Sequence, residues 1–152
     1  MDNIGVLLHN YVLNCAVLAW FSAQIIKTLL VLVTTKRFVP ERIFGPGGMP
    51  SAHSASVCAL AIATCKMNGF SSVEFAITFM LACIVMYDAT SVRRQAGEHA
   101  KAINKVVDRI EDDDDDSLDI NELKEVLGHT PLEVLAGALL GILISMILPA
   151  GA

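Results

Sequence analysis

Residues 3–26 read NIGVLLHNYVLNCAVLAWFSAQII and contain no Asp, Glu, Lys or Arg. A helix of about 20 apolar residues crosses the hydrocarbon core of a bilayer, so this run is long enough to span. Three further runs without charged residues follow, at 43–65, 75–87 and 134–152. A surface helix of a soluble protein shows a polar stripe every three to four residues, and these runs lack one. The sequence therefore predicts an α-helical integral membrane protein.

The overall composition agrees with this class. Hydrophobic residues make up 54% of the 152 residues, which is above the usual share in soluble domains, and the length suits one membrane domain, 1–152. The four cysteines lie in apolar runs without a CxxC pair, a pattern typical of buried small side chains rather than disulfides or metal ligands. We therefore expect no metal and no cofactor. No basic stripe interleaved with aromatic residues indicates nucleic acid as a partner.

Proline, glycine and charged residues divide the chain into spanning helices, predicted at about 9–35, 51–66, 71–89 and 131–148. The 36–50 loop carries prolines and glycines that exclude a continuous helix. The 90–130 loop begins with an amphipathic pattern, which predicts a helix lying along the membrane surface or packed on the bundle. An acidic linker, 111–119, and a short polar helix, 119–127, follow. The expected architecture is an all-α bundle of about four spanning helices plus an amphipathic surface helix.

Basic residues are distributed unevenly between the two sides of this arrangement. The 36–50 and 90–130 loops lie on the same side and hold nine of the eleven Lys and Arg residues. These are Lys36, Arg37, Arg42, Arg93, Arg94, Lys101, Lys105, Arg109 and Lys124. Loops rich in Lys and Arg stay in the cytoplasm. We therefore expect a multi-pass protein of the cell membrane with both loops in the cytoplasm and both termini outside.

Polar side chains that are costly inside a membrane gather at the predicted cytoplasmic ends of these helices. They are Lys27, Ser51, His53, Asp88, Arg93, His129 and Glu133. Small residues recur at four-residue intervals on the helix faces of Lys27, Ser51 and His129, and such stripes let membrane helices approach closely. Packing the stripes together would bring Lys27, His53 and His129 to one place.

Each of these side chains also has a structural interpretation. The alternatives are snorkelling to the headgroups for Lys27, helix capping for His53 and Asp88, a turn position for His129, and surface anchoring for Arg93 and Arg94. The acidic run 112–116 fits a solvated turn, with calcium binding as a weaker interpretation, because it lacks the regular ligand spacing and glycine of a dedicated loop.

Two histidines, a lysine and an arginine at one interface suit the hydrolysis of a phosphate ester. Cations neutralise the phosphoryl oxygens, one imidazole attacks phosphorus, and the other protonates the leaving alkoxide. Glu133, one turn after His129, would hold the second ring nitrogen of that histidine and fix its tautomer. The backbone amides of Gly47 and Gly48 would donate to the phosphate, because glycine permits a close approach.

Three motifs carry a resemblance to a known superfamily. Residues 47–55 read GGMPSAHSA and look like the PSGH motif of the type 2 phosphatidic acid phosphatases and vanadium haloperoxidases. Residues 129–137 read HTPLEVLAG and look like their HxxxD segment. With YDA at 87–89 and VRR at 92–94, the chain resembles most closely the small divergent branch of that superfamily.

The resemblance implies His129 as the nucleophile that becomes phosphorylated, Glu133 as its orienting acid and His53 as the general acid. The residues expected to hold phosphate are Ser51, Gly47, Gly48, Lys27 and Arg93, with Asp88 and Arg94 as secondary candidates. Two positions depart from the superfamily pattern: Thr34 stands where its first arginine is expected, and Leu123 stands six residues before the nucleophile. Arg93 or Arg94 would then supply the guanidinium.

Two functions from different classes follow. The first is a membrane-embedded phosphatase that hydrolyses a lipid phosphate, or an isoprenoid diphosphate, through a phosphohistidine intermediate. The second is a non-catalytic membrane protein that keeps an anion or lipid-headgroup pocket or acts as an assembly partner. A transporter has less support, since no inverted repeat is visible. The expected partners are a phosphorylated lipid and the bilayer, with a homo-oligomer left open.

Overall fold

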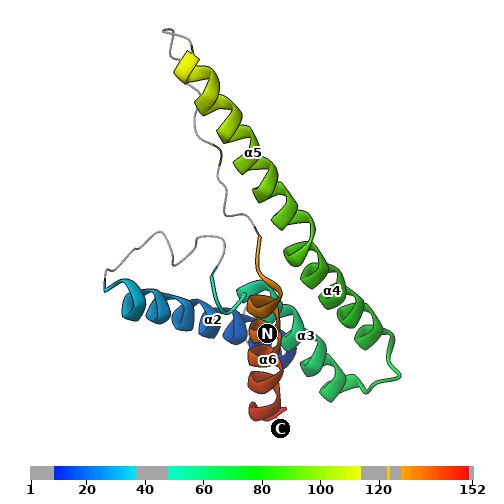
Figure 1. Cartoon of the computed structure of the whole chain (residues 1–152). Helices are drawn as coiled ribbons and strands as arrows, with labels where there is room; N and C mark the ends of the chain where they lie inside the picture. The colour runs from blue at the N-terminus through cyan, green and yellow to red at the C-terminus, as the bar shows by residue number, and fades with distance from the viewer. Residues whose placement is uncertain (1–8, 37–47, 114–122, 124–127, 151–152) are drawn as a thin grey trace.

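The computed structural model describes residues 9–36, 48–113, 123 and 128–150, with the side chains of 110–113 excepted. The described residues form helices and no strands. With the labels of Figure 1, the helices are α2 (Tyr11–Thr35), α3 (Ala52–Asn68), α4 (Val73–Thr90), α5 (Val92–Asp113) and α6 (Pro131–Ile147). The predicted all-α class is confirmed. Gly47 and most of the 119–127 segment lie outside the described residues, Leu123 being the exception.

Helix α3 lies at the centre of the bundle and packs against α2, α4 and α6. Its buried side chains are all small: Ala52, Ser54, Ala55, Cys58, Ala59, Ala61, Ala63 and Thr64. Large hydrophobic side chains point outward instead, and many on α2, α4 and α6 are more than 40% exposed. A soluble protein buries its large hydrophobic residues. Small residues inside and large ones outside are typical of helices that pack in lipid.

Helices α3 and α6 run in the same direction with their backbones in close contact. A Cβ on Gly137 would collide with the carbonyl of Ser51, and one on Gly141 would collide with the carbonyl of Ala55. One turn further on, the hydroxyl of Ser145 donates to the carbonyl of Ala59 at 2.9 Å. The predicted stripes of small residues on these two helices therefore face each other, turn for turn.

Helix α2 packs on α3 and α6 through residues four apart, Cys15, Ala19, Ala23 and Lys27. At the start of α2, the Tyr11 hydroxyl donates to the carbonyl of Leu148 at 3.0 Å. Lys66 Nζ, from the end of α3, donates to the same carbonyl at 2.8 Å and to that of Ser145 at 2.8 Å. These bonds satisfy carbonyl groups that the last turn of a helix leaves without partners.

Helix α5 continues α4 after a turn at Ser91 and leads away from the bundle (Figure 1). Its amphipathic character is confirmed, with a strong separation of polar and apolar faces. The structure shows contact of α5 mainly with α4 and with the returning chain at Leu123 and Gly128. Of the two predicted placements, packing along the bundle is therefore not observed. The helix also extends to Asp113, so the first residues of the predicted acidic linker are helical.

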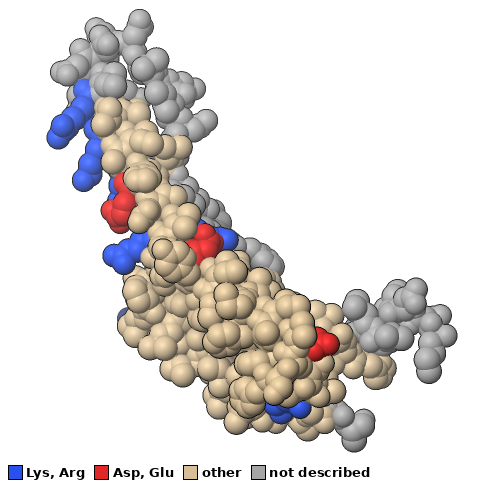
Figure 2. All heavy atoms as spheres, turned by 90° about the vertical axis from the view of Figure 1, so that its right-hand side faces the viewer, with Lys and Arg blue, Asp and Glu red and all other residues tan. Residues whose placement is uncertain are grey.

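Two helical segments among the described residues are long and apolar enough to cross a membrane: Tyr11–Thr35 and the continuous Val73–Arg109 segment. Helix α6 is apolar but has 17 residues, and α3 has the same length. At 1.5 Å per residue each spans about 25 Å, a little less than a typical hydrocarbon core. Figure 2 shows charged side chains gathered along α5, whereas the face of the bundle in view carries few. The fold is that of a helical membrane bundle.

Candidate functional site

Backbone hydrogen bonds bring three distant segments together at one end of the bundle. The amide of Ser51 donates to the carbonyl of Glu133 at 3.0 Å, which joins the starts of α3 and α6. The amide of His129 donates to the carbonyl of Ala89 at 3.0 Å, which ties the segment before α6 to the end of α4. This end of the bundle carries the residues predicted to form the site.

His129 and Glu133 form the best-defined contact of the site. The histidine is 7% exposed, and its Nδ1 lies 3.0 Å from Glu133 Oε2. A carboxylate only accepts, so the neutral imidazole carries its proton on Nδ1 and keeps the lone pair on Nε2. The predicted contact between His129 and Glu133 is therefore present, and the roles of nucleophile and orienting acid stay predictions.

Glu133 has a second task, which is to start α6. Its Oε2 accepts from the backbone amide of Thr130 at 3.0 Å, and the Thr130 hydroxyl accepts from the Glu133 amide at 3.3 Å. This reciprocal pair is a capping box, with Pro131 in the first turn of the helix. The same carboxylate oxygen thus fixes the start of the helix and the ring of His129.

His53 stands on the first turn of α3, with its side chain exposed toward the same end. Four charged or ionisable groups are close enough to act electrostatically on its ring: Arg93, His129, Lys27 and Asp88. His129 and both predicted cations therefore lie near His53, and their action in one site stays a prediction. They reach this place from α2, α3, the α4–α5 junction and the segment before α6.

Lys27 is buried at 4% exposure in the middle of α2. Gly48 lies over its aliphatic chain, since a Cβ on Gly48 would come within 3.3 Å of Lys27 Cγ. Gly48 has a φ of 86°, a backbone conformation that residues other than glycine rarely adopt. The predicted neighbours Lys27 and Gly48 are therefore in contact. Gly47 lies outside the described residues.

Ser51 is fully buried and caps α3. Its Oγ accepts from the amide of Ser54 at 3.4 Å and from the Ser54 hydroxyl at 3.1 Å. The hydroxyl group therefore has a structural role at the start of the helix, and its phosphate-binding role stays a prediction. The structural interpretation of His53 as the cap is not needed here, because Ser51 performs it.

The α4–α5 junction presents Arg93 beside the site. Arg93 Nε donates to Asp88 Oδ2 at 2.6 Å, and the two side chains are 52% and 35% exposed. Arg94 contributes through its backbone instead: a Cβ on Gly128 would collide with its N and Cα atoms. Arg93 thus reaches the rim of the site in an ion pair, while Arg94 packs against the segment leading to His129.

Sequence reasoning did not single out Gln24. This residue lies one turn before Lys27 on α2 and is 9% exposed. Its Oε1 has no hydrogen-bond partner among the residues that the structure describes, and an unpaired buried carbonyl costs about 1–3 kcal/mol. A glutamine within an otherwise apolar run, three residues from a buried lysine, is the signal that would have identified it.

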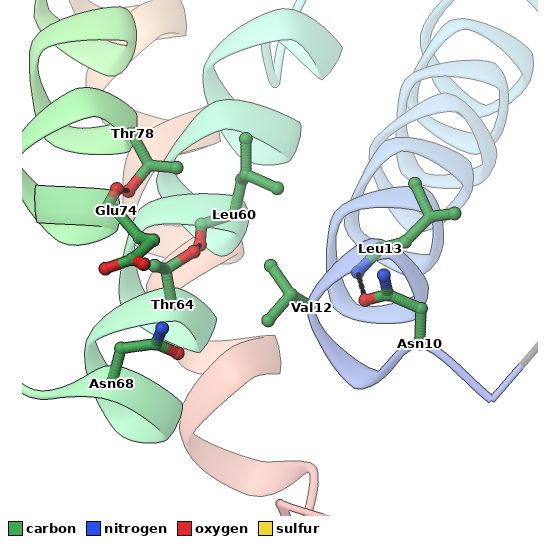
Figure 3. Close-up of a pocket in the computed structure, with 8 residues that line it drawn as sticks. All are labelled: Asn10, Val12, Leu13, Leu60, Thr64, Asn68, Glu74 and Thr78. Carbon is green, nitrogen blue, oxygen red and sulfur yellow. Dashed lines mark hydrogen bonds between the residues drawn. The ribbon is translucent and has the colours of Figure 1, made fainter. Parts of the chain in front are cut away.

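An open groove lies at the opposite end of the bundle, between α2 and the α3–α4 pair (Figure 3). Its volume is about 390 Å³, and its lining comprises Asn10, Val12, Leu13, Leu60, Thr64, Asn68, Glu74 and Thr78. It contains none of the predicted site residues. Within the described part of the chain, no three His, Cys, Asp or Glu residues are placed to share a metal ion.

Comparison with known proteins bears on the same motifs. The model of the divergent PAP2 family matches residues 8–144 of this chain. The chain belongs to the divergent PAP2 family. It is also similar to the uncharacterized membrane protein YuiD of Bacillus subtilis (strain 168), with 38% identity over 151 residues. That alignment covers 93% of this chain and 96% of YuiD. No solved structure matches. Family membership confirms the predicted resemblance and leaves the reaction open.

Proposed function

We propose that this member of the divergent PAP2 family hydrolyses a lipid phosphate, or an isoprenoid diphosphate, at the cytoplasmic face of the cell membrane. The observation that carries the proposal is the hydrogen bond from His129 Nδ1 to Glu133, which leaves Nε2 as a nucleophile. His53 and Lys27 lie at the same end of the bundle, close enough for the charge of Lys27 to act on the His53 ring. Family membership supports the same chemistry by kinship.

The proposed reaction has two steps. In the first, His129 Nε2 attacks phosphorus, the bond from phosphorus to the leaving oxygen breaks, and His53 gives that oxygen its proton. In the second, water attacks the phosphohistidine, His53 takes the proton of the water, and the P–N bond breaks to release phosphate. Lys27 and Arg93 would neutralise the phosphoryl oxygens in both steps, and the Gly48 amide would add a donor.

A lipid is the proposed substrate because of where these groups lie. They stand at the end of a bundle whose outer surface is covered by large hydrophobic side chains, and the basic loops predict that this end faces the cytoplasm. A phosphate group at the membrane surface would reach the site while its apolar chain stays in the bilayer. Lys27, buried within α2, would meet the phosphate at the depth of the headgroups.

One observation favours the second candidate, a pocket that binds an anion without turnover. The guanidinium of Arg93 is paired with Asp88 and is half exposed, whereas Lys27 is buried. A single lysine would attract a phosphate group but give less stabilisation to the transition state than the two cations together.

The two candidates are separated by measuring phosphate release and binding in the same preparation. Purified protein in detergent micelles is incubated with a panel of lipid phosphates, together with His129→Ala and, as a matched control, His9→Ala at the opposite end of the bundle. We expect release by wild type and by His9→Ala, none by His129→Ala, and competitive inhibition by vanadate, which mimics five-coordinate phosphorus. Equal binding by wild type and His129→Ala with no release by either would establish the binding pocket instead.

A further inference from the structure

Helix α5 presents three faces with different surroundings. Gly97, Ala100 and Asn104 form a buried face, where the Asn104 side chain bonds both the amide and the carbonyl of Leu123, at 3.0 Å and 2.9 Å. A second face carries charged side chains, including the ion pair of Lys101 with Glu98. The third face is apolar and exposed. Leu123 therefore contacts one side of α5, and the apolar side is exposed.

The open face has the spacing of a coiled-coil seam. Val92, Ile103 and Val106 are 57%, 49% and 56% exposed, and Ala96 and His99 complete the series between them. Successive members are four, three, four and three residues apart. Apolar residues that alternate in this way mark the a and d positions of a heptad, and four of these five residues are apolar, with His99 as the exception. Two further residues of the sequence, Ile110 and the preceding Val107, keep the pattern apolar beyond Val106.

Charges on α5 leave the middle of this seam free. From Gln95 to Val107, the flanking e and g positions are uncharged, namely Gln95, Ala100, Ala102 and Val107. The charged residues Arg94, Glu98, Lys101, Lys105 and Asp108 occupy the c and f positions, on the far side of the helix, whereas Arg93 and Arg109 hold the e and g positions at the two ends of the seam. Like charges across a coiled-coil interface repel, and none would face each other along this stretch.

We propose that the apolar face of α5, defined by Val92, Ala96, His99, Ile103 and Val106, binds the same face of a second copy of this chain in a parallel two-helix coiled coil. Helix α5 continues α4 beyond the bundle (Figure 1), so its seam lies outside the bundle of α2, α3, α4 and α6. In two copies inserted in the same orientation, α5 extends from the same face of the membrane. The two helices would therefore pair in parallel, related by a two-fold axis.

Membrane confinement compensates for the short length of this seam. Three to four heptads are normally expected of a coiled coil that is stable by itself, and the five residues of the seam cover about two. Two chains held in one membrane meet at a raised effective concentration, as linked binding modules do. The proposal is independent of catalysis, because pairing through α5 requires neither His129 nor a substrate.

The test is disulfide trapping of the full-length protein in native membranes. Val106→Cys lies at a d position, and the matched control Lys105→Cys lies at the neighbouring c position on the far side. With a mild oxidant we expect a covalent dimer for Val106→Cys and little for Lys105→Cys or for wild type, whose own cysteines report any background. Ile103→Lys combined with Val106→Lys should shift the uncrosslinked protein to the mass of a monomer in detergent.

Three outcomes would overturn the proposal. Equal trapping of Val106→Cys and Lys105→Cys would mean random collision, and a monomeric wild type in both membranes and detergent would exclude a dimer. A fluorophore at Ile103→Cys provides the remaining comparison: strong quenching by lipid-borne quenchers would show that the bilayer surface covers this face, whereas protection from lipid and from aqueous quenchers alike supports the second copy.

Discussion

Glu133 shows how one side chain serves both folding and the site. Its Oε2 accepts from the Thr130 amide and lies 3.0 Å from His129 Nδ1. Glu133→Gln keeps an acceptor oxygen but loses the charge that would stabilise an imidazolium, so we expect kcat to fall by about 10²-fold. His129→Ala should abolish turnover. The measurement is the rate of phosphate release from one lipid phosphate at saturating concentration.

Thr130→Ala separates the two tasks of Glu133. This change removes the capping hydroxyl and costs about 1 kcal/mol of stability, while the contact of His129 with Glu133 stays in place. We expect a lower melting temperature with kcat unchanged. If Thr130→Ala and Glu133→Gln reduce kcat equally, Glu133 acts only as a cap.

His53 gives a third prediction, which concerns the leaving group. As a proton donor it matters most when the departing oxygen is a poor leaving group. His53→Ala should therefore lower the rate on an alkyl phosphate by about 10²-fold or more, and change the rate on a nitrophenyl phosphate far less. Equal losses on both substrates would contradict the general-acid role.

Sequence patterns were sufficient for the contacts that lie within one helix turn. His129 and Glu133 are four residues apart at the start of a helix, so their contact could be predicted from spacing. The convergence with His53 followed from stripes and topology. The burial of Ser51 agrees with its place on a predicted small-residue stripe. The Gln24 carbonyl, which lacks a partner among the described residues, could not be predicted, because it depends on how α2 packs.

At the scale of helices, the α3–α6 contact is the part of the fold most sensitive to substitution. Gly141→Leu would place a side chain against the Ala55 carbonyl, and overpacking of this kind typically costs 1–3 kcal/mol or more. We expect a lower melting temperature in detergent, followed by circular dichroism. Leu139→Ala, on the exposed face of the same helix, is the control and should change stability by about 0.5 kcal/mol or less. Equal effects of the two changes would argue against tight backbone packing.

The small-residue stripes on α3 and α6 were visible in the sequence because four-residue spacing of Gly, Ala and Ser is a local pattern. The direction of α5 was not. At Ser91 the chain could end one helix and start the next in a new direction, or the next helix could follow with little change of direction. The structure shows the second arrangement. Amphipathicity alone predicts which face of a helix is buried and does not identify the surface against which it packs.

At the scale of the whole molecule, the charge distribution predicts an orientation. Lys105 on α5 should be cytoplasmic, and Phe70, 78% exposed between α3 and α4, should lie outside. Labelling of intact cells with an impermeant thiol reagent should reach Phe70→Cys and miss Lys105→Cys until the cells are opened. Wild type controls for the native cysteines. The reverse pattern would place the candidate site on the external face.

The two glycines of α6 also act as a ruler for the site. Gly137 and Gly141 seat α6 against single carbonyl groups of α3, and a helix advances about 1.5 Å per residue. A slip of one residue along this contact would therefore move His129 by about that distance past the first turn of α3. Misplacement of about 1 Å already costs a reaction about 10²-fold. The separation of the His53 and His129 imidazoles thus depends on two glycines without a Cβ, which lie about 12–18 Å further along the chain from His129.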